Sequence, residues 1–126
     1  MIRMLAGLSN CKTTKATPAS TSIFEIANQT GVMPKLVHIS CSSDSHAIIN
    51  NGYVVEAWYT QNFGTMATRN GSTGGNVLYW QYPTEEKTTQ RDKYYLSESE
   101  ISLNQGNATS TGRWSTLTEY TVEIYT

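Results

Sequence analysis

The sequence predicts an all-β protein: an antiparallel β-sandwich of jelly-roll-like type, preceded by a short N-terminal arm. Apolar residues alternate with polar residues in most of the apolar segments, and no segment carries a 3.6-residue stripe of helical length. Turn residues recur about every 8–12 residues, as in sandwiches and barrels. A chain of 126 residues fits one domain. We therefore expect an arm and linker over residues 1–20 and a sandwich over residues 21–126.

Each predicted strand is bounded by a turn signal. Gly31 and Pro34 mark a turn, and Asn51-Gly52 has the composition of a type I′ hairpin turn, in which both residues take a positive φ. Pro83 has no N–H to donate to a ladder, so we expect a strand to end there. The predicted strands are 23–26, 35–41, 53–59, 63–68, 76–82, 93–96, 100–103 and 119–126.

The alternation also predicts which side chains form the core, because successive residues of a strand point to opposite faces of the sheet. The predicted core residues are Phe24, Ile26, Val37, Ile39, Val55, Ala57, Leu78, Leu96, Val122 and Ile124.

Composition argues against several classes of partner. The net charge is −1, charged residues make up 15% of the chain, and the nine Lys and Arg residues are scattered. A nucleic-acid surface needs clustered basic residues, so we expect no nucleic-acid partner. No run of about 20 apolar residues exists, which argues against a membrane span. The apolar run after Arg3 is too short for a signal peptide, and without one Cys11 and Cys41 are expected to be free thiols.

The N-terminal segment differs from the rest of the chain. Met1, Met4, Leu5 and Leu8 fall at positions i, i+3, i+4 and i+7, which lie on one face of two helical turns. A polar Ser/Thr/Lys linker follows through Ser20. This apolar set either packs on its own domain or docks on a neighbour, and we assign it as a partner-binding arm.

No catalytic or metal-binding motif stands out. His38, Cys41, Asp44 and His46 lie within nine residues, but zinc sites usually combine two pairs of closely spaced ligands, and no second pair is present. The same residues lack the sequence context of an activated nucleophile. We therefore expect no catalytic residues, no metal and no cofactor.

Aromatic residues are the more informative group. Tyr and Trp outnumber Phe by eleven to two. In adjacent pairs such as Tyr79-Trp80 one ring must face outward. Exposed rings serve as protein interfaces, stack on sugars, or cover a sheet face with cross-strand partners. The ligand or interface aromatics proposed from the sequence are Trp58, Trp80, Tyr82 and Trp114.

The order of strands and turns is the last clue. A polar lead-in precedes residues 21–26, a Gly-x-x-Pro-Lys turn at Gly31–Lys35 enters a hydrophobic strand, and a strand with a Thr-x-Tyr start at Thr118 closes the chain. Over about residues 20–126 this layout resembles small β-sandwich virion proteins of tailed bacteriophages and prophages.

That resemblance implies a non-enzymatic virion structural protein, either a capsid decoration protein or a component of a head or tail fibre. It also implies a homo-oligomer that binds capsid or tail proteins and is made in the host cytoplasm. Two alternatives stay open: a carbohydrate-binding or adhesion module that uses Trp58, Trp80 or Trp114 to bind a glycan, and a small hydrolase that uses the His and Asp residues.

Overall fold

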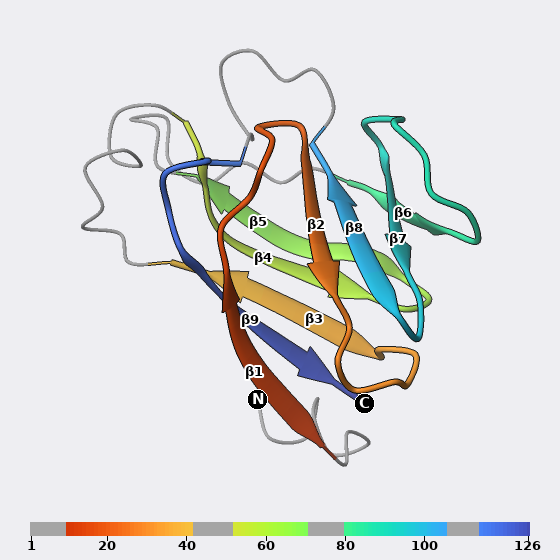
Figure 1. Cartoon of the computed structure of the whole chain (residues 1–126). Coiled ribbons are helices and arrows are strands. Elements are labelled where there is room, and N and C mark those ends of the chain that lie inside the picture. The colour runs from red at the N-terminus through yellow and green to blue at the C-terminus, as the bar shows by residue number, and fades with distance from the viewer. Residues whose placement is uncertain (1–9, 42–51, 71–79, 106–113) are drawn as a thin grey trace.

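The computed structural model describes residues 10–41, 52–70, 80–105 and 114–126, and these ranges contain nine strands and no helix (Figure 1). The strands are β1 (Cys11–Ala16), β2 (Ile23–Ala27), β3 (Leu36–Ser40), β4 (Val54–Thr60), β5 (Gly64–Asn70), β6 (Tyr82–Thr84), β7 (Lys93–Leu96), β8 (Glu100–Asn104) and β9 (Tyr120–Tyr125).

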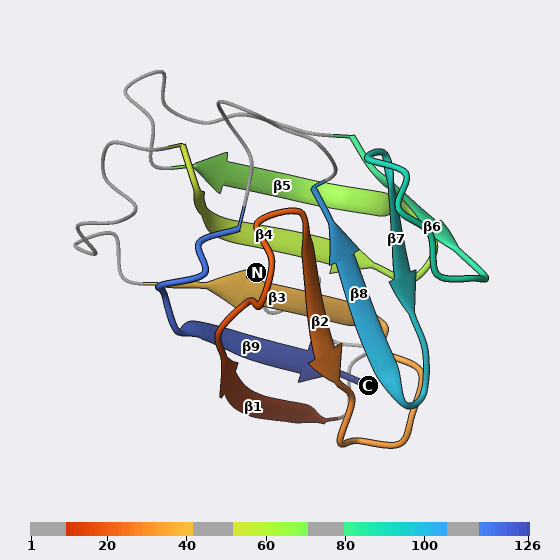
Figure 2. The same cartoon turned by 45° about the horizontal axis from the view of Figure 1, so that its top comes forward.

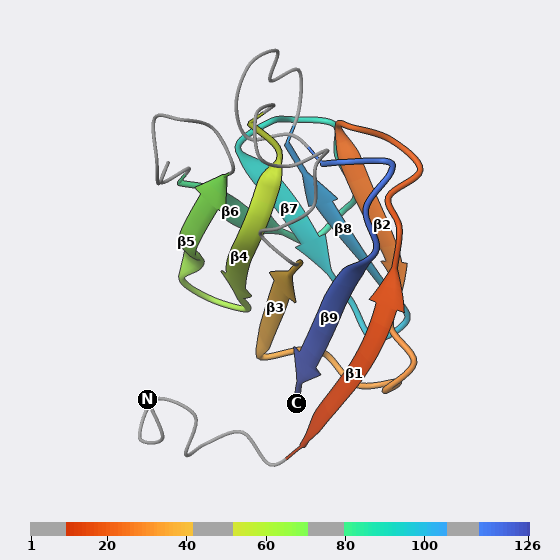
Figure 3. The same ribbon diagram turned by 90° about the vertical axis from the view of Figure 1, so that its left-hand side faces the viewer.

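Two sheets pack face to face as a β-sandwich, which confirms the predicted fold class (Figures 1 and 3). One sheet has five strands in the order β1-β9-β3-β4-β5, and the other has four in the order β2-β8-β7-β6. Figure 2 shows the strands of the smaller sheet crossing over those of the larger one. All described pairs are antiparallel except β6 with β7, which is parallel.

Only the connections that involve β1, β2, β3 and β9 resemble those of a jelly roll, in which the chain passes from one sheet to the other. Strands β1, β2 and β3 alternate between the two sheets, and the last strand, β9, lies between β1 and β3. Strands β3, β4 and β5 instead follow one another in the same sheet as a meander. None of the elements in the described part of the chain is a helix long and apolar enough to cross a membrane.

Strand β1 lies in the segment predicted as a linker, which corrects that prediction. It pairs with β9 from Cys11 opposite Tyr125 to Ala16 opposite Tyr120, so residues 11–16 belong to the sandwich. All six β1 side chains are exposed or half-buried, and Ala16 packs against the core. A strand at the edge of a sheet can be polar on both faces. The period-two signal is therefore absent from its sequence.

Strand β6 corrects the prediction that a strand over residues 76–82 ends before Pro83. The described strand runs through Pro83, which pairs with Tyr94 of β7, and residues 76–79 lie outside the described residues. Because β6 is the edge of the four-stranded sheet, one side of it needs no ladder partner. A proline is tolerated there.

The predicted hairpin turn is described only in part. Gly52 has a φ of 69°, the left-handed conformation that the Asn51-Gly52 pair predicts for it. Asn51 and residues 48–49 lie outside the described residues.

The core forms where the inner faces of the two sheets meet. Every predicted core residue in the described ranges is buried, and Leu78 lies outside them. The buried residues that were predicted are Phe24, Ile26, Val37, Ile39, Val55, Ala57, Leu96, Val122 and Ile124.

Three tyrosines also belong to the core, and their hydroxyls are hydrogen-bonded. The hydroxyl of Tyr94 donates to the Thr60 carbonyl at 2.5 Å, that of Tyr120 donates to the Val54 carbonyl at 2.7 Å, and that of Tyr59 accepts from the Gln105 amide at 3.2 Å. Burial raises the pKa of Tyr94 to about 12, and it raises the pKa values of Tyr59 and Tyr120 well above the ordinary value. Much of the aromatic content therefore stabilises the fold.

Candidate functional site

The structure separates the aromatic residues proposed from the sequence. Trp114 is fully buried, so its assignment as a ligand or interface aromatic is wrong. Its ring packs edge-on against Phe24, with the centroids 5.1 Å apart, and its indole N–H donates to the Leu103 carbonyl at 2.9 Å. The sequence around Trp114 is polar and gives no sign of this burial.

Trp58 is half-buried on the outer face of the five-stranded sheet, where its ring stacks on His38 of the neighbouring strand. Trp80 and Tyr82 are exposed, at 52% and 46%. The four arm residues, Met1, Met4, Leu5 and Leu8, lie outside the described residues. Their role as a partner-binding arm stays a prediction.

Trp80 and Tyr82 are neighbouring exposed rings, and Phe63, which sequence reasoning missed, precedes Gly64, whose Cβ position would lie 3.6 Å from the Trp80 ring. Phe63 is 78% exposed in the turn between β4 and β5. The ring centroids of Trp80 and Tyr82 are 5.9 Å apart in an edge-on arrangement, and the Lys93 ammonium lies 5.0 Å from the centroid of Tyr82. We call Phe63, Trp80 and Tyr82 the aromatic ridge. A phenylalanine between Asn62 and Gly64, two turn-forming residues, was the available signal.

Buried contacts hold the two segments of the ridge together. The N–H of Thr65 donates to the Gln81 carbonyl at 3.0 Å, which joins β5 to the segment that carries Trp80. The buried side chain of Gln81 donates through Nε2 to the carbonyl oxygens of Arg91, at 2.7 Å, and of Asn104. The ridge is therefore attached to both sheets through one buried glutamine.

The turn that carries Phe63 is also fixed. The Phe63 N–H donates to Oγ1 of Thr60 at 3.1 Å, and that hydroxyl donates to the Gly64 carbonyl at 2.8 Å. Two such bonds order the backbone of the turn, which lowers the entropy that the backbone loses on binding.

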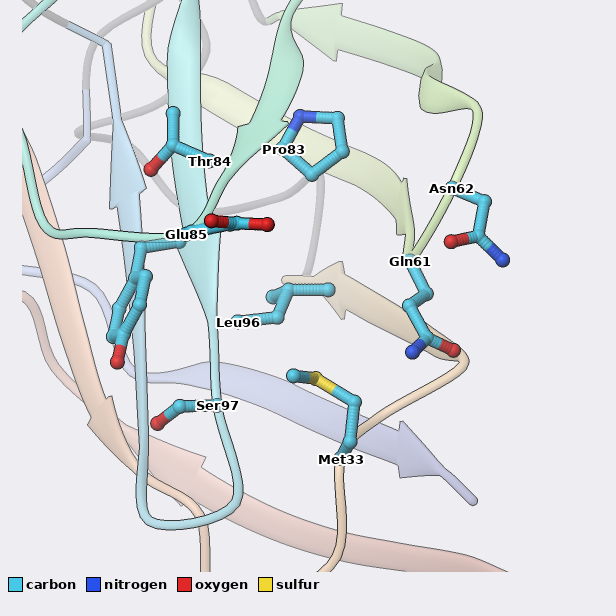
Figure 4. A pocket seen from close by; sticks show the side chains of 9 residues that line it. Met33, Gln61, Asn62, Pro83, Thr84, Glu85, Leu96 and Ser97 are labelled. Carbon is cyan, nitrogen blue, oxygen red and sulfur yellow. The ribbon is translucent and has the colours of Figure 1, made fainter.

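A cleft of about 470 Å³ lies beside the ridge, at the edge of the sandwich (Figure 4). The same two segments border both features, because Gln61 and Asn62 precede Phe63, and Pro83 and Thr84 follow Tyr82. The cleft is lined by Met33, Gln61, Asn62, Pro83, Thr84, Glu85, Tyr95, Leu96 and Ser97.

A second polar cluster lies on the outer face of the five-stranded sheet. His38 of β3 lies between Glu123 of β9 and Glu56 of β4: Nδ1 is 2.6 Å from Oε1 of Glu123, and Nε2 is 2.7 Å from Oε2 of Glu56. The Trp58 ring stacks on the imidazole with the centroids 3.7 Å apart. The cluster thus connects three adjacent strands.

This cluster does not have the geometry of a metal site. Its two imidazole nitrogens face different carboxylates, so the three side chains do not converge on one point. No group of three or more His, Cys, Asp or Glu side chains suited to a metal occurs in the described ranges, while Asp44 and His46 fall outside them. Cys11 and Cys41 are both thiols, Cys11 being exposed.

Comparison with known proteins adds no functional assignment. No protein-family model, no curated protein and no solved structure matches this chain.

Proposed function

We propose that the chain is a non-enzymatic structural component of a bacteriophage particle, either a capsid decoration protein or part of a head or tail fibre. It works by binding further copies of itself and a capsid or tail partner. Support comes from the resemblance in strand and turn order and from the sandwich architecture. The observation that carries the proposal is the aromatic ridge, an exposed apolar surface on an ordered backbone.

The ridge has the composition of an interface centre. Trp and Tyr are enriched among the residues that contribute most to binding free energy, and such residues usually lie at the centre of an interface. Burying one large apolar side chain contributes about 1.5–3 kcal/mol. A stable interface needs roughly 800 Å² from each partner, so the polar surface around the ridge would have to form the rim.

The other large apolar residues that are exposed in the described ranges are Leu117 and Val32, which lie apart in the sequence. Leu117 is 85% exposed and Val32 is 52% exposed, and each comes from a separate loop. Single exposed apolar side chains are ordinary features of protein surfaces. Leu117 precedes β9, whereas Phe63 follows β4, and the strand register places these positions at opposite ends of the sheet.

Sedimentation velocity of three proteins tests the role of the ridge. The wild type should sediment as an oligomer, and a Phe63→Ser/Trp80→Ser variant should sediment as a monomer with an unchanged circular dichroism spectrum. Leu117→Ser is the matched control, because it removes an equally exposed apolar side chain away from the ridge, and it should stay oligomeric. Equal sedimentation of all three proteins would remove the support that the ridge gives to the proposal.

A further inference from the structure

The cleft beside the aromatic ridge contains polar groups that the fold itself does not use. Within the described residues, the side-chain amides of Gln61 and Asn62, the Glu85 carboxylate and the Tyr95 hydroxyl make no hydrogen bond or ion pair. Ser97 differs, because its hydroxyl donates to the Glu100 carbonyl at 2.8 Å.

These unused groups come from three separate parts of the chain. Figure 4 shows Gln61 and Asn62 on the β4–β5 side of the cleft and Glu85 on the β6 side, with Leu96 and Met33 between them. The polar groups thus surround an apolar floor. A small-ligand site commonly has this arrangement, with a few polar groups around an apolar surface and a volume of roughly 300–1,000 Å³. The cleft, at about 470 Å³, falls within that range.

The chemistry of the lining restricts the class of ligand. Among the described residues, no Lys, Arg or His lines the cleft, and Glu85 is its one carboxylate, so an anionic ligand would meet repulsion without compensation. A calcium ion takes 6–8 oxygen ligands, usually including several carboxylates, and one carboxylate with two amides falls short of that. The two amides both donate and accept hydrogen bonds, whereas the carboxylate only accepts them. A ligand that matches must carry several neutral hydroxyl groups and an apolar face.

We propose that this cleft binds a neutral saccharide. The vicinal hydroxyls of the sugar donate to the Glu85 carboxylate and exchange hydrogen bonds with the amides of Gln61 and Asn62. The C–H face of the ring lies on the apolar side chains of Met33 and Leu96. This assignment goes beyond the proposed structural role in the virion and does not depend on it. It also differs from the sites proposed from sequence, since none of Trp58, Trp80 and Trp114 lines the cleft.

The loss of affinity that we expect for each cleft variant depends on which hydrogen bonds to the saccharide it removes. A hydrogen bond to a charged group contributes more to affinity than a bond between neutral groups, and its loss weakens binding by about tenfold or more. Glu85→Gln should therefore weaken saccharide binding about tenfold or more. Asn62→Ala removes neutral hydrogen bonds and should weaken it by a smaller factor, about threefold to tenfold.

The experiment uses the full chain on an array of neutral and sialylated or sulfated glycans, followed by calorimetric titration with the neutral glycan that binds best. We expect neutral glycans alone to bind, with the stated losses for Glu85→Gln and Asn62→Ala. Glu119→Gln is the control, because Glu119 is exposed and precedes β9 at the end of the sheet opposite to Gln61, so the affinity of this variant should be unchanged. Melting temperatures of all variants establish that they are folded.

Three results would overturn the assignment: no neutral glycan bound anywhere on the array, preferential binding of acidic glycans, or wild-type affinity in both cleft variants. Oligomeric state does not enter this readout. Failure of saccharide binding and failure of assembly are therefore separate outcomes.

Discussion

Gly64 and Gln81 approach each other more closely than any side chain would allow. A Cβ atom at position 64 would lie 2.6 Å from the Gln81 carbonyl oxygen, and Gly64 also has a φ of 93°. This contact brings the segment that carries Trp80 against the start of β5. The aromatic ridge can therefore take this position only because residue 64 is a glycine, which has no Cβ atom.

Replacing Gly64 by Ala should lower the free energy of unfolding by about 2–4 kcal/mol, because both the positive φ and the backbone contact oppose a Cβ. Gly31→Ala is a matched control: Gly31 has a φ of 71°, but no atom lies within 4 Å of the point that its Cβ would occupy. That change should cost only the conformational term, about 1 kcal/mol. Urea denaturation measures both, and equal losses would show that the contact with Gln81 is unimportant.

The cluster around His38 should stabilise the larger sheet. His38→Ala would remove the imidazole that lies between the carboxylates of Glu56 and Glu123, and we expect a loss of about 1–2 kcal/mol in the free energy of unfolding, since both carboxylates are partly exposed. In a Glu123→Gln background the same change should cost less, because one of the two like charges is already removed. Urea denaturation of the wild type, the two single variants and the double variant gives the coupling free energy between His38 and Glu123. Identical costs of His38→Ala in both backgrounds would contradict a stabilising interaction between these two side chains.

Stability should fall in alkaline solution. The pKa of Tyr94 is raised from 10.0 to about 12, mainly by burial, so the folded state binds this proton more tightly than the unfolded state does. The resulting stabilisation is complete below about pH 10 and is lost as the pH rises towards 12. Tyr94→Phe should show a shallower decline over this range, although it loses the bond to Thr60. Urea midpoints measured as a function of pH test this, and parallel curves for both proteins would refute it.

Two truncations separate the predicted arm from the first strand. Removing residues 1–9 deletes Met1, Met4, Leu5 and Leu8 but leaves β1 intact, so the melting temperature should change little while assembly is lost. Removing residues 1–16 also deletes β1, which pairs with β9 along its whole length, and should lower the melting temperature clearly. If the shorter truncation lowers the melting temperature and leaves association intact, the arm packs on its own domain.

Strands with one buried face were predictable from sequence, including β2 at one sheet edge, whereas two other edge strands, β1 and β6, were not predicted correctly. In β9 the burial alternates strictly from Tyr120 to Tyr125, and the sequence shows the same alternation. No side chain of β1 is fully buried, so its sequence lacks the alternation of apolar and polar residues and resembles that of a linker. The parallel pairing of β6 through Pro83 depends on tertiary contacts that carry no local signal.

The candidate site was predictable only in part, for a related reason. The exposure of Trp80 and Tyr82 agrees with the expectation from sequence, whereas Trp114 fills the core between Phe24 and Tyr120. Trp114 is buried because side chains from distant strands pack against it, and the spacing of residues in the sequence does not encode these contacts. The cleft likewise joins four segments of the chain, around Met33, Gln61, Thr84 and Leu96, and no motif links them.

The most direct test of whether this chain acts by assembly is a native mass spectrum of the full-length protein. We predict a closed oligomer of one defined stoichiometry, as expected for a symmetric component of a particle. A spectrum that contains only the 14.0 kDa monomer at every concentration would contradict assembly as the basis of its function.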